Sequence, residues 1–245
     1  MYLEPLKADS LVEAFVKRFE ELIISGKLTI GQKIPSEREL AKQLGVSRPV
    51  VHEGLIILEQ KGLVTIRPRH GVTVNDYRRE GSLAILQSLV SYATGQFEPH
   101  ILESLLATRT LIELETVKLA AQHRTQQQLD EFRAIITEEQ SLIPAQTQAI
   151  VDVDFKFHHL IALASGNVVY PLLLNSFRQV YTNLTYQFFL DTSVVDFVFA
   201  HHQKLVGAIA QKDSKKAVQI MSSLLDHGQR HLKTFIQKQQ LKEAL

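Results

Sequence analysis

The chain has 245 residues, of which 45% are hydrophobic and 22% charged, and its formal net charge is +1. This composition is typical of a packed globular protein and excludes a disordered or low-complexity chain. The absence of cysteine excludes a disulfide scaffold, a thiolate zinc site and a cysteine nucleophile. No apolar run approaches a membrane span, and residues 1–10 lack the apolar stretch of a signal peptide, so we expect a cytoplasmic protein with no membrane partner.

The first part of the chain has the pattern of three helices. Residues 9–25 place apolar side chains on one helical stripe, and Gly26 ends that helix. A second helix begins at Ser36, where Ser36-Glu37-Arg38-Glu39 fits a capping box, and it ends at Gly45. A third helix is expected from Ser47, as N-cap, to about Lys61.

Two β-branched runs follow, at residues 63–66 and 72–74, and the segment between them is Arg67-Pro68-Arg69-His70-Gly71. This pattern predicts a hairpin with a basic tip. Together with the preceding helices it predicts a winged helix-turn-helix domain in residues 1–75. Residues 31–75 carry seven basic and four acidic side chains, an excess too small by itself to indicate nucleic acid.

The predicted unit suggests how the chain contacts double-stranded DNA. The N-terminal end of the third helix enters the major groove in such domains, and Arg48 stands there, where it can pair with a guanine edge. The wing tip is expected to enter the adjacent minor groove. The alternative is that these basic residues are ordinary surface charges. The predicted DNA-binding residues are Arg38, Lys42, Ser47, Arg48, Pro49, His52, Arg69 and His70.

Residues 34–41, Ile-Pro-Ser-Glu-Arg-Glu-Leu-Ala, and residues 44–48, Leu-Gly-Val-Ser-Arg, resemble the N-terminal domain of GntR-type bacterial transcription regulators. Leu55, Leu58-Glu59 and Gly62-Leu63-Val64 continue the resemblance. The chain departs from it at His52-Glu53-Gly54, where the family usually has Arg and then Glu-Ala. Gly54 is expected to weaken the helix by about 1 kcal/mol relative to Ala.

Residues 76–81 are polar and indicate a short linker. Residues 82–245 have helical periodicity without strand alternation, which predicts an all-α bundle and a mainly α protein. The expected helices are residues 82–94, 98–123, 125–142, 146–164, 168–190, 194–211 and 214–239.

The bundle resembles the FCD, or FadR-type, effector-binding domain of the same regulators, which implies an effector-binding and dimerisation domain over residues 82–245. The residues that carry this resemblance are Thr108-Arg109-Thr110, Asp154 to His158 with the turn Ala164-Ser165-Gly166-Asn167, and His202 to Leu205. Arg109 interrupts an apolar helix face, so its partner is either an effector carboxylate or an internal Glu. Asn167 and Tyr181 are further expected effector contacts, because their surroundings resemble the acyl-CoA-responsive branch.

Asp154 and His158 lie four positions apart and therefore share one helix face, so that a carboxylate oxygen and an imidazole nitrogen can converge on a divalent cation with His202. The alternative is a buried Asp–His pair. In the FCD family a further His, 22 residues after the one matching His202, completes the ligand set. This chain has Leu224 there, and His227 is the candidate replacement. The implied ion is zinc, nickel or manganese.

The two resemblances imply a regulator, not an enzyme, that binds a palindromic operator as a homodimer and acts as a repressor. Its effector is expected to be a small metabolite, a carboxylate bound through the metal. An alternative within the same class senses fatty acyl-CoA without a metal, and an architectural DNA binder without a ligand is another. A metal-dependent hydrolase is a remote alternative, because the sequence lacks a phosphate loop and a Gly-x-Ser-x-Gly elbow.

Overall fold

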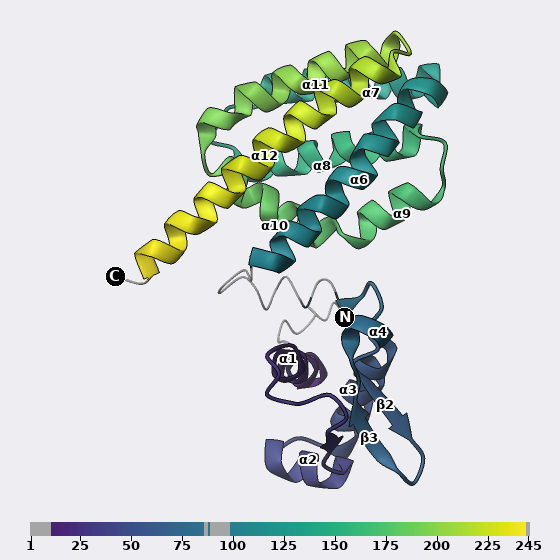
Figure 1. Cartoon of the computed structure of the whole chain (residues 1–245), viewed down its shortest axis with the longest axis vertical. Coiled ribbons are helices and arrows are strands. Elements are labelled where there is room, and N and C mark those ends of the chain that lie inside the picture. Colours follow the sequence, from purple (N-terminus) through teal and green to yellow (C-terminus); the bar gives the residue numbers. More distant parts are fainter. Residues whose placement is uncertain (1–10, 86–87, 89–98, 244–245) are drawn as a thin grey trace, which may run out of the picture. The chain divides into compact units, whose positions relative to one another are not determined.

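The structure is a computed structural model that describes residues 11–85, 88 and 99–243 (Figure 1). The chain divides into two compact units, residues 1–95 and 96–245. Within the described ranges, no helix is both long and apolar enough to cross a bilayer.

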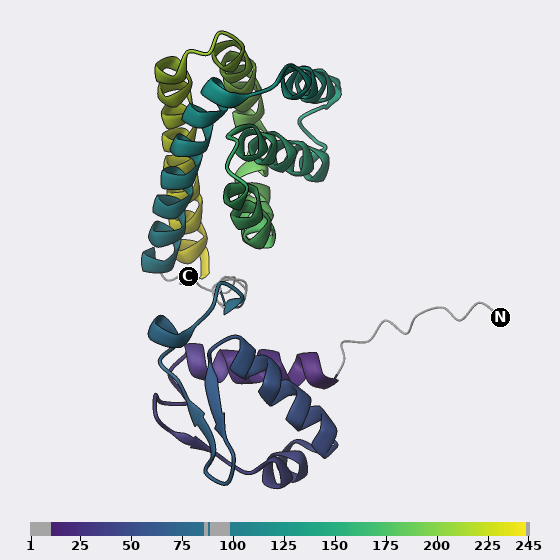
Figure 2. The same cartoon turned by 90° about the vertical axis from the view of Figure 1, so that its right-hand side faces the viewer.

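The N-terminal unit is a winged helix-turn-helix, as the sequence predicts. It contains α1 (Leu11–Ile24), α2 (Glu37–Leu44) and α3 (Arg48–Gln60), with the strands β1 (Lys33–Ile34), β2 (Val64–Arg67) and β3 (Gly71–Val74). The strands form an antiparallel sheet in the order β1-β3-β2, and the hairpin of β2 and β3 is visible in Figure 2. The two-residue β1 was not predicted, because it is too short to show a period.

The predicted capping box is present at the start of α2. The Ser36 hydroxyl accepts a hydrogen bond from the Glu39 backbone N–H at 3.3 Å, and the Glu39 carboxylate accepts one from the Ser36 N–H at 2.9 Å. Gly45 ends α2 in the left-handed conformation with φ of 66°, which costs glycine little. Ser47 is the N-cap of α3, but its side chain makes no capping hydrogen bond.

The packing of α1 on α3 explains Gly54. Val51, Leu55 and Leu58 of α3 are fully buried in the core of this unit, which also contains Phe15 of α1. A Cβ atom at position 54 would lie only 2.3 Å from Cδ1 of Phe15. Glycine at position 54 therefore lets the Phe15 ring pack close to the backbone of α3. The sequence predicted only that Gly54 weakens the helix, because this contact with α1 is not visible in the local pattern.

The segment after the wing, where a linker is predicted at residues 76–81, makes contacts with the N-terminal unit. Residues Tyr77–Glu80 form the short helix α4, and Ile85 is buried in the same core as α1 and α3. The Lys61 ammonium donates to Glu20 at 2.5 Å and to Ser88 at 3.4 Å. The expected helix over residues 82–94 lies largely outside the described residues.

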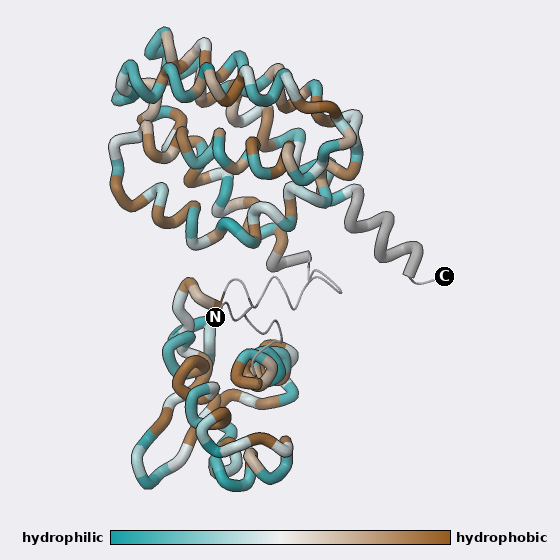
Figure 3. The backbone as a smooth tube through the Cα atoms, turned by 180° about the vertical axis from the view of Figure 1, so that it is seen from behind, coloured by the Kyte–Doolittle hydropathy of each residue, from teal (hydrophilic) through white to brown (hydrophobic). Residues whose placement is uncertain are grey.

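The C-terminal unit is the expected helical bundle. Its helices are α6 (Pro99–His123), α7 (Gln126–Ser141), α8 (Thr147–Ala164), α9 (Val169–Ser176), α10 (Arg178–Phe189), the 3-10 turn η1 (Thr192–Val194), α11 (Val195–Ala210) and α12 (Ser214–Glu243). α6 and α12 run side by side, and α8 packs against α6, α7, α9 and α10 (Figure 1). Apolar residues recur between polar ones along the helices of this unit (Figure 3). This is the pattern of helices with one buried face.

The single helix predicted over residues 168–190 is wrong. The chain forms α9 and α10 with a break at Phe177, whose φ is −93° and ψ is 0°. The Ser176 hydroxyl donates to the Leu172 carbonyl at 2.9 Å. Such back-bonding bends helices, and the apolar pattern continues through the bend, so periodicity does not reveal it.

Gly54→Ala is expected to lower the melting temperature. Overpacking against Phe15 costs about 1–3 kcal/mol, which exceeds the gain in helix propensity of about 1 kcal/mol. Thermal denaturation followed by circular dichroism checks this. The matched control is Gly207→Ala on α11, where an added Cβ meets no atom within 4 Å and the propensity gain stands alone. Equal stabilisation by both substitutions would contradict the packing of Phe15 on Gly54.

Candidate functional site

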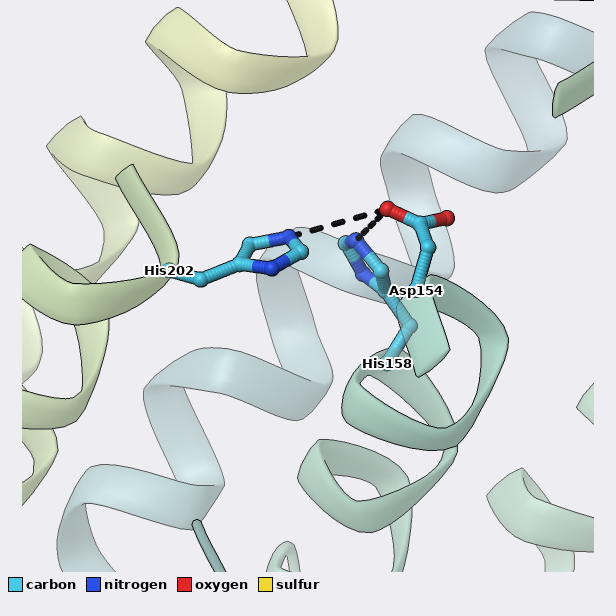
Figure 4. A group of neighbouring side chains, drawn as sticks. All are labelled: Asp154, His158 and His202. Carbon is cyan, nitrogen blue, oxygen red and sulfur yellow. Dashed lines mark ion pairs between the residues drawn. The ribbon is translucent and has the colours of Figure 1, made fainter. Parts of the chain in front are cut away.

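Three potential metal ligands converge inside the C-terminal unit. Asp154 and His158 lie one turn apart on α8, and His202 comes from α11 (Figure 4). All three are buried, and their ligand atoms lie within 4.8 Å of one another. Oδ1 of Asp154 is 3.9 Å from Nε2 of His158 and 3.7 Å from Nε2 of His202. These distances leave space for a cation between the three atoms.

Each of these side chains is held at its far atom by another buried side chain. Nδ1 of His202 is 2.6 Å from Oε1 of Glu139 on α7, and Nδ1 of His158 faces Oε2 of Glu113 on α6. The Tyr181 hydroxyl on α10 donates to Oδ2 of Asp154 at 2.9 Å. Nε2 of both imidazoles has no hydrogen-bond partner among the described residues. Both Nε2 atoms thus face Oδ1 of Asp154 without a hydrogen bond, and Nδ1 of His158 also lacks one in the described structure although it contacts Glu113.

Arg109 joins this network from α6. Its guanidinium donates to Glu113 at 2.5 Å and to the Tyr181 hydroxyl at 2.8 Å. Burial by itself would raise the pKa of Glu113, but the neighbouring Arg109 and His158 outweigh burial and hold that pKa at about 2. Burial raises the pKa of Tyr181 well above its usual value, so its hydroxyl remains a donor. Of the two alternatives for Arg109, the internal Glu is the partner that the structure contains.

Two small cavities adjoin the network. One, of about 30 Å³, touches Asp154 and His158 and includes Leu224 in its wall. The other, of about 60 Å³, has Arg109 and Tyr181 in its wall. The second cavity is otherwise mostly apolar, with walls formed by Leu105, Leu106, Ile112, Leu174, Phe177, Val180 and Leu184.

His227 and Asn167, predicted to bind the metal and the effector, are not part of the group formed by Asp154, His158 and His202. His227 on α12 is not part of the converging group, and its ring stacks on Phe197 with the centroids 4.0 Å apart. The prediction of His227 as a replacement ligand therefore does not match the structure, because its helical position directs it to another neighbour. Asn167 is exposed in the turn before α9, where its side chain accepts from the Val169 N–H at 2.8 Å.

The two glutamates were not predicted as part of the site from the sequence. Glu139 lies on the buried stripe of α7, with Leu129, Phe132 and Ile135. An acidic residue on an apolar stripe is the sequence signal that could have identified it as functional. Glu113 lies four positions after Arg109 on α6. Which imidazole each glutamate contacts depends on tertiary packing, which one sequence does not show.

The predicted DNA-contacting residues are all exposed. Arg48 and Pro49 begin α3, and the Ser47 hydroxyl beside them is not used for capping. Nδ1 of His52 is 2.8 Å from Oε1 of Glu37, so this side chain is engaged with α2 across the turn. Arg69 lies in the three-residue turn of the wing with φ of 66°, a conformation that is uncommon for a residue other than glycine.

Comparison with known proteins identifies both units. The model of the bacterial regulatory proteins of the gntR family matches residues 6–74, and the FCD domain matches residues 104–227. The regulator Mce2R of Mycobacterium tuberculosis is 29% identical over 231 residues, covering 92% of this chain and 93% of its own. The uncharacterized regulator YcbG of Bacillus subtilis is 30% identical, with 88% and 89% of the two chains covered.

A fatty acid metabolism regulator protein of Proteus mirabilis is 26% identical and covers 86% of this chain and 85% of its own. The solved structure of Lar, which controls expression of the Listeria monocytogenes agr system, aligns with a TM-score of 0.63 at 15% identity. It covers 94% of this chain and 99% of Lar, and it supports the fold alone. The matching proteins are regulators and not enzymes, so the hydrolase alternative is wrong. The chain belongs to the gntR family of bacterial regulatory proteins, and it is a DNA-binding transcriptional regulator with an FCD effector domain.

Proposed function

We propose that this regulator is a repressor that senses a small carboxylate through a divalent metal ion held by Asp154, His158 and His202. The observation that carries the proposal is that three ligand atoms face one another while the far atom of each side chain is held by a partner. An Asp and two imidazoles are ligands that suit zinc, nickel or manganese.

The charge of the buried network also supports a bound dication. Asp154, Glu113 and Glu139 are three carboxylates, and Arg109 is the one guanidinium in contact with them in the described structure. A divalent cation bound through two neutral imidazoles would bring these three carboxylates and one guanidinium to no net charge. Uncompensated buried charge is costly, and one divalent cation offsets it.

The cavity beside the proposed metal favours a small ligand. Leu224 supplies no ligand atom, so the cavity side of the three-residue set is open to an effector carboxylate. The apolar wall of the cavity, which includes Phe188, Phe189 and Leu225, contacts the remainder of such a molecule. The cavity's volume of about 30 Å³, on the order of one water molecule, leaves no room for a long chain.

A second candidate is an apolar acyl ligand bound without a metal. It is favoured by the apolar cavity beside Arg109, in which the guanidinium offers a charge to an acid group. The fatty acid metabolism regulator of Proteus mirabilis is consistent with this candidate by its name alone. The two candidates differ in their need for a metal.

For DNA, we propose that two copies of the chain place the N-terminal end of α3 in successive major grooves of a palindromic operator. The exposed Arg48 and the uncapped Ser47 are available there to a base edge and to a phosphate. The strained backbone of Arg69 supports a role for the wing tip, since such strain is retained mainly where it serves function.

Arg48→Ala is expected to weaken binding to the operator by about 1–3 kcal/mol, the contribution of one base contact, while non-specific binding changes less. The operator is first selected from a random duplex pool, and affinities are then measured at one salt concentration. Arg18→Ala on α1, an exposed charge in the same unit, is the control. Undiminished sequence-specific binding by Arg48→Ala would show that α3 does not read bases as proposed.

Purified protein is expected to retain about one divalent ion per chain, and His202→Ala is expected to lose it because one ligand is removed. Metal analysis after dialysis measures both. The matched control is His201→Ala, whose ring bonds to the Phe197 carbonyl and lies outside the group. A wild-type protein that binds no divalent ion would remove the metal from the proposal and leave the acyl candidate.

Leu224→His is expected to tighten metal binding by more than about tenfold, since losing even an outer partner of a ligand costs 10- to 100-fold. Leu224 shares the cavity wall with Asp154 and His158, so an imidazole there can add a fourth ligand. Chelator competition measures the affinity. An unchanged affinity for the metal would mean that the open side of the Asp154, His158 and His202 site does not face Leu224.

A further inference from the structure

We infer that Glu139 and Glu113 are positioning residues of the proposed metal centre, and that Glu139 has the larger effect on metal affinity. The inference rests on the proposed function. It concerns residues that do not touch the metal themselves and act through His202 and His158.

The His202 ring is held on two sides. Glu139 is 1% exposed and lies 2.6 Å from Nδ1 of His202. The Phe157 ring stacks on the imidazole with the centroids 3.9 Å apart and an interplanar angle of 16°. The ring therefore cannot turn without losing a buried carboxylate contact or the stacked face, and Nε2 stays directed at Asp154.

The carboxylate also determines which ring nitrogen binds metal. An acceptor at Nδ1 keeps the proton on that nitrogen, so Nε2 carries the lone pair that a cation needs. The same hydrogen bond makes the imidazole a stronger donor to the metal. Glu113 faces Nδ1 of His158 in the same way, so both imidazoles present Nε2.

The two glutamates differ in their other contacts. Glu113 is shared with the guanidinium of Arg109 at 2.5 Å, which compensates its charge. Oε2 of each glutamate is buried without a hydrogen bond, but Glu139 has no guanidinium or ammonium partner in the described part of the chain. The charge of Glu139 is thus available to a cation at His202, while that of Glu113 also stabilises the fold.

This difference predicts opposite effects on stability and on metal binding. Glu139→Gln removes an uncompensated buried charge, so the melting temperature of the metal-free protein stays the same or rises. The same substitution lowers affinity for zinc by about 10- to 100-fold. Glu113→Gln leaves Arg109 without its buried partner, so it lowers the melting temperature as well.

The test titrates full-length protein with Zn²⁺ in competition with a chelator and measures melting of the metal-free forms. The matched control is Glu138→Gln, whose exposed carboxylate contacts Lys156 at 2.7 Å next to Glu139 in the sequence. The inference is supported if Glu139→Gln weakens zinc binding more than Glu113→Gln does and keeps undiminished stability, while Glu138→Gln binds zinc like the wild type. Wild-type affinity in Glu139→Gln overturns it.

A second measurement separates failure of the inference from failure of the proposed function. If the wild type binds no zinc, the metal proposal fails, and ¹⁵N shifts of the His202 ring in the metal-free protein then test the positioning role. Protonation at Nδ1 that is lost in Glu139→Leu supports it, because leucine offers no acceptor. The same ring signals in both proteins overturn it.

Discussion

The interior of the C-terminal unit is organised by contacts among ionisable side chains that its helices bury together. Asp154, His158, Glu113, Glu139 and His202 come from four helices, and each is almost completely removed from water. A carboxylate in such an interior is tolerated only with a hydrogen-bonded or charged partner. The helices must therefore keep their register relative to one another, because a shift of one turn separates these partners.

Polar contacts of this kind also determine what the bundle can bind. An apolar core of the same size would pack equally well and would recognise little. Here the interior contains a directed set of acceptor atoms next to a cavity whose walls are largely apolar. Polar ligand atoms and an apolar wall thus lie side by side within one unit.

Local sequence patterns predicted the features that depend on local chemistry. The capping box at Ser36, the helix end at Gly45 and the shared face of Asp154 and His158 all follow from local residues and short spacings. The two-domain class and the family also follow, because their motifs are continuous in the chain.

The features that sequence patterns missed depend on contacts across the fold. Glu139 was not recognised because its partner is 63 positions away, on α11. The need for glycine at position 54 arises from the Phe15 ring on another helix. The bend at Phe177 interrupts a continuous apolar pattern, and only the packed structure shows where the chain turns.

The contacts at the end of α3 have a mechanical consequence. Lys61 caps this helix and bonds to both Glu20 and Ser88, while the backbone of Glu80 lies so close to Gly62 that a side chain would not fit there. The segment that follows the wing is therefore anchored at the C-terminal end of α3, by Glu80 at Gly62 and by Ser88 at Lys61. A change in the position of Ser88 alters the hydrogen bonding of Lys61, the residue at which α3 ends.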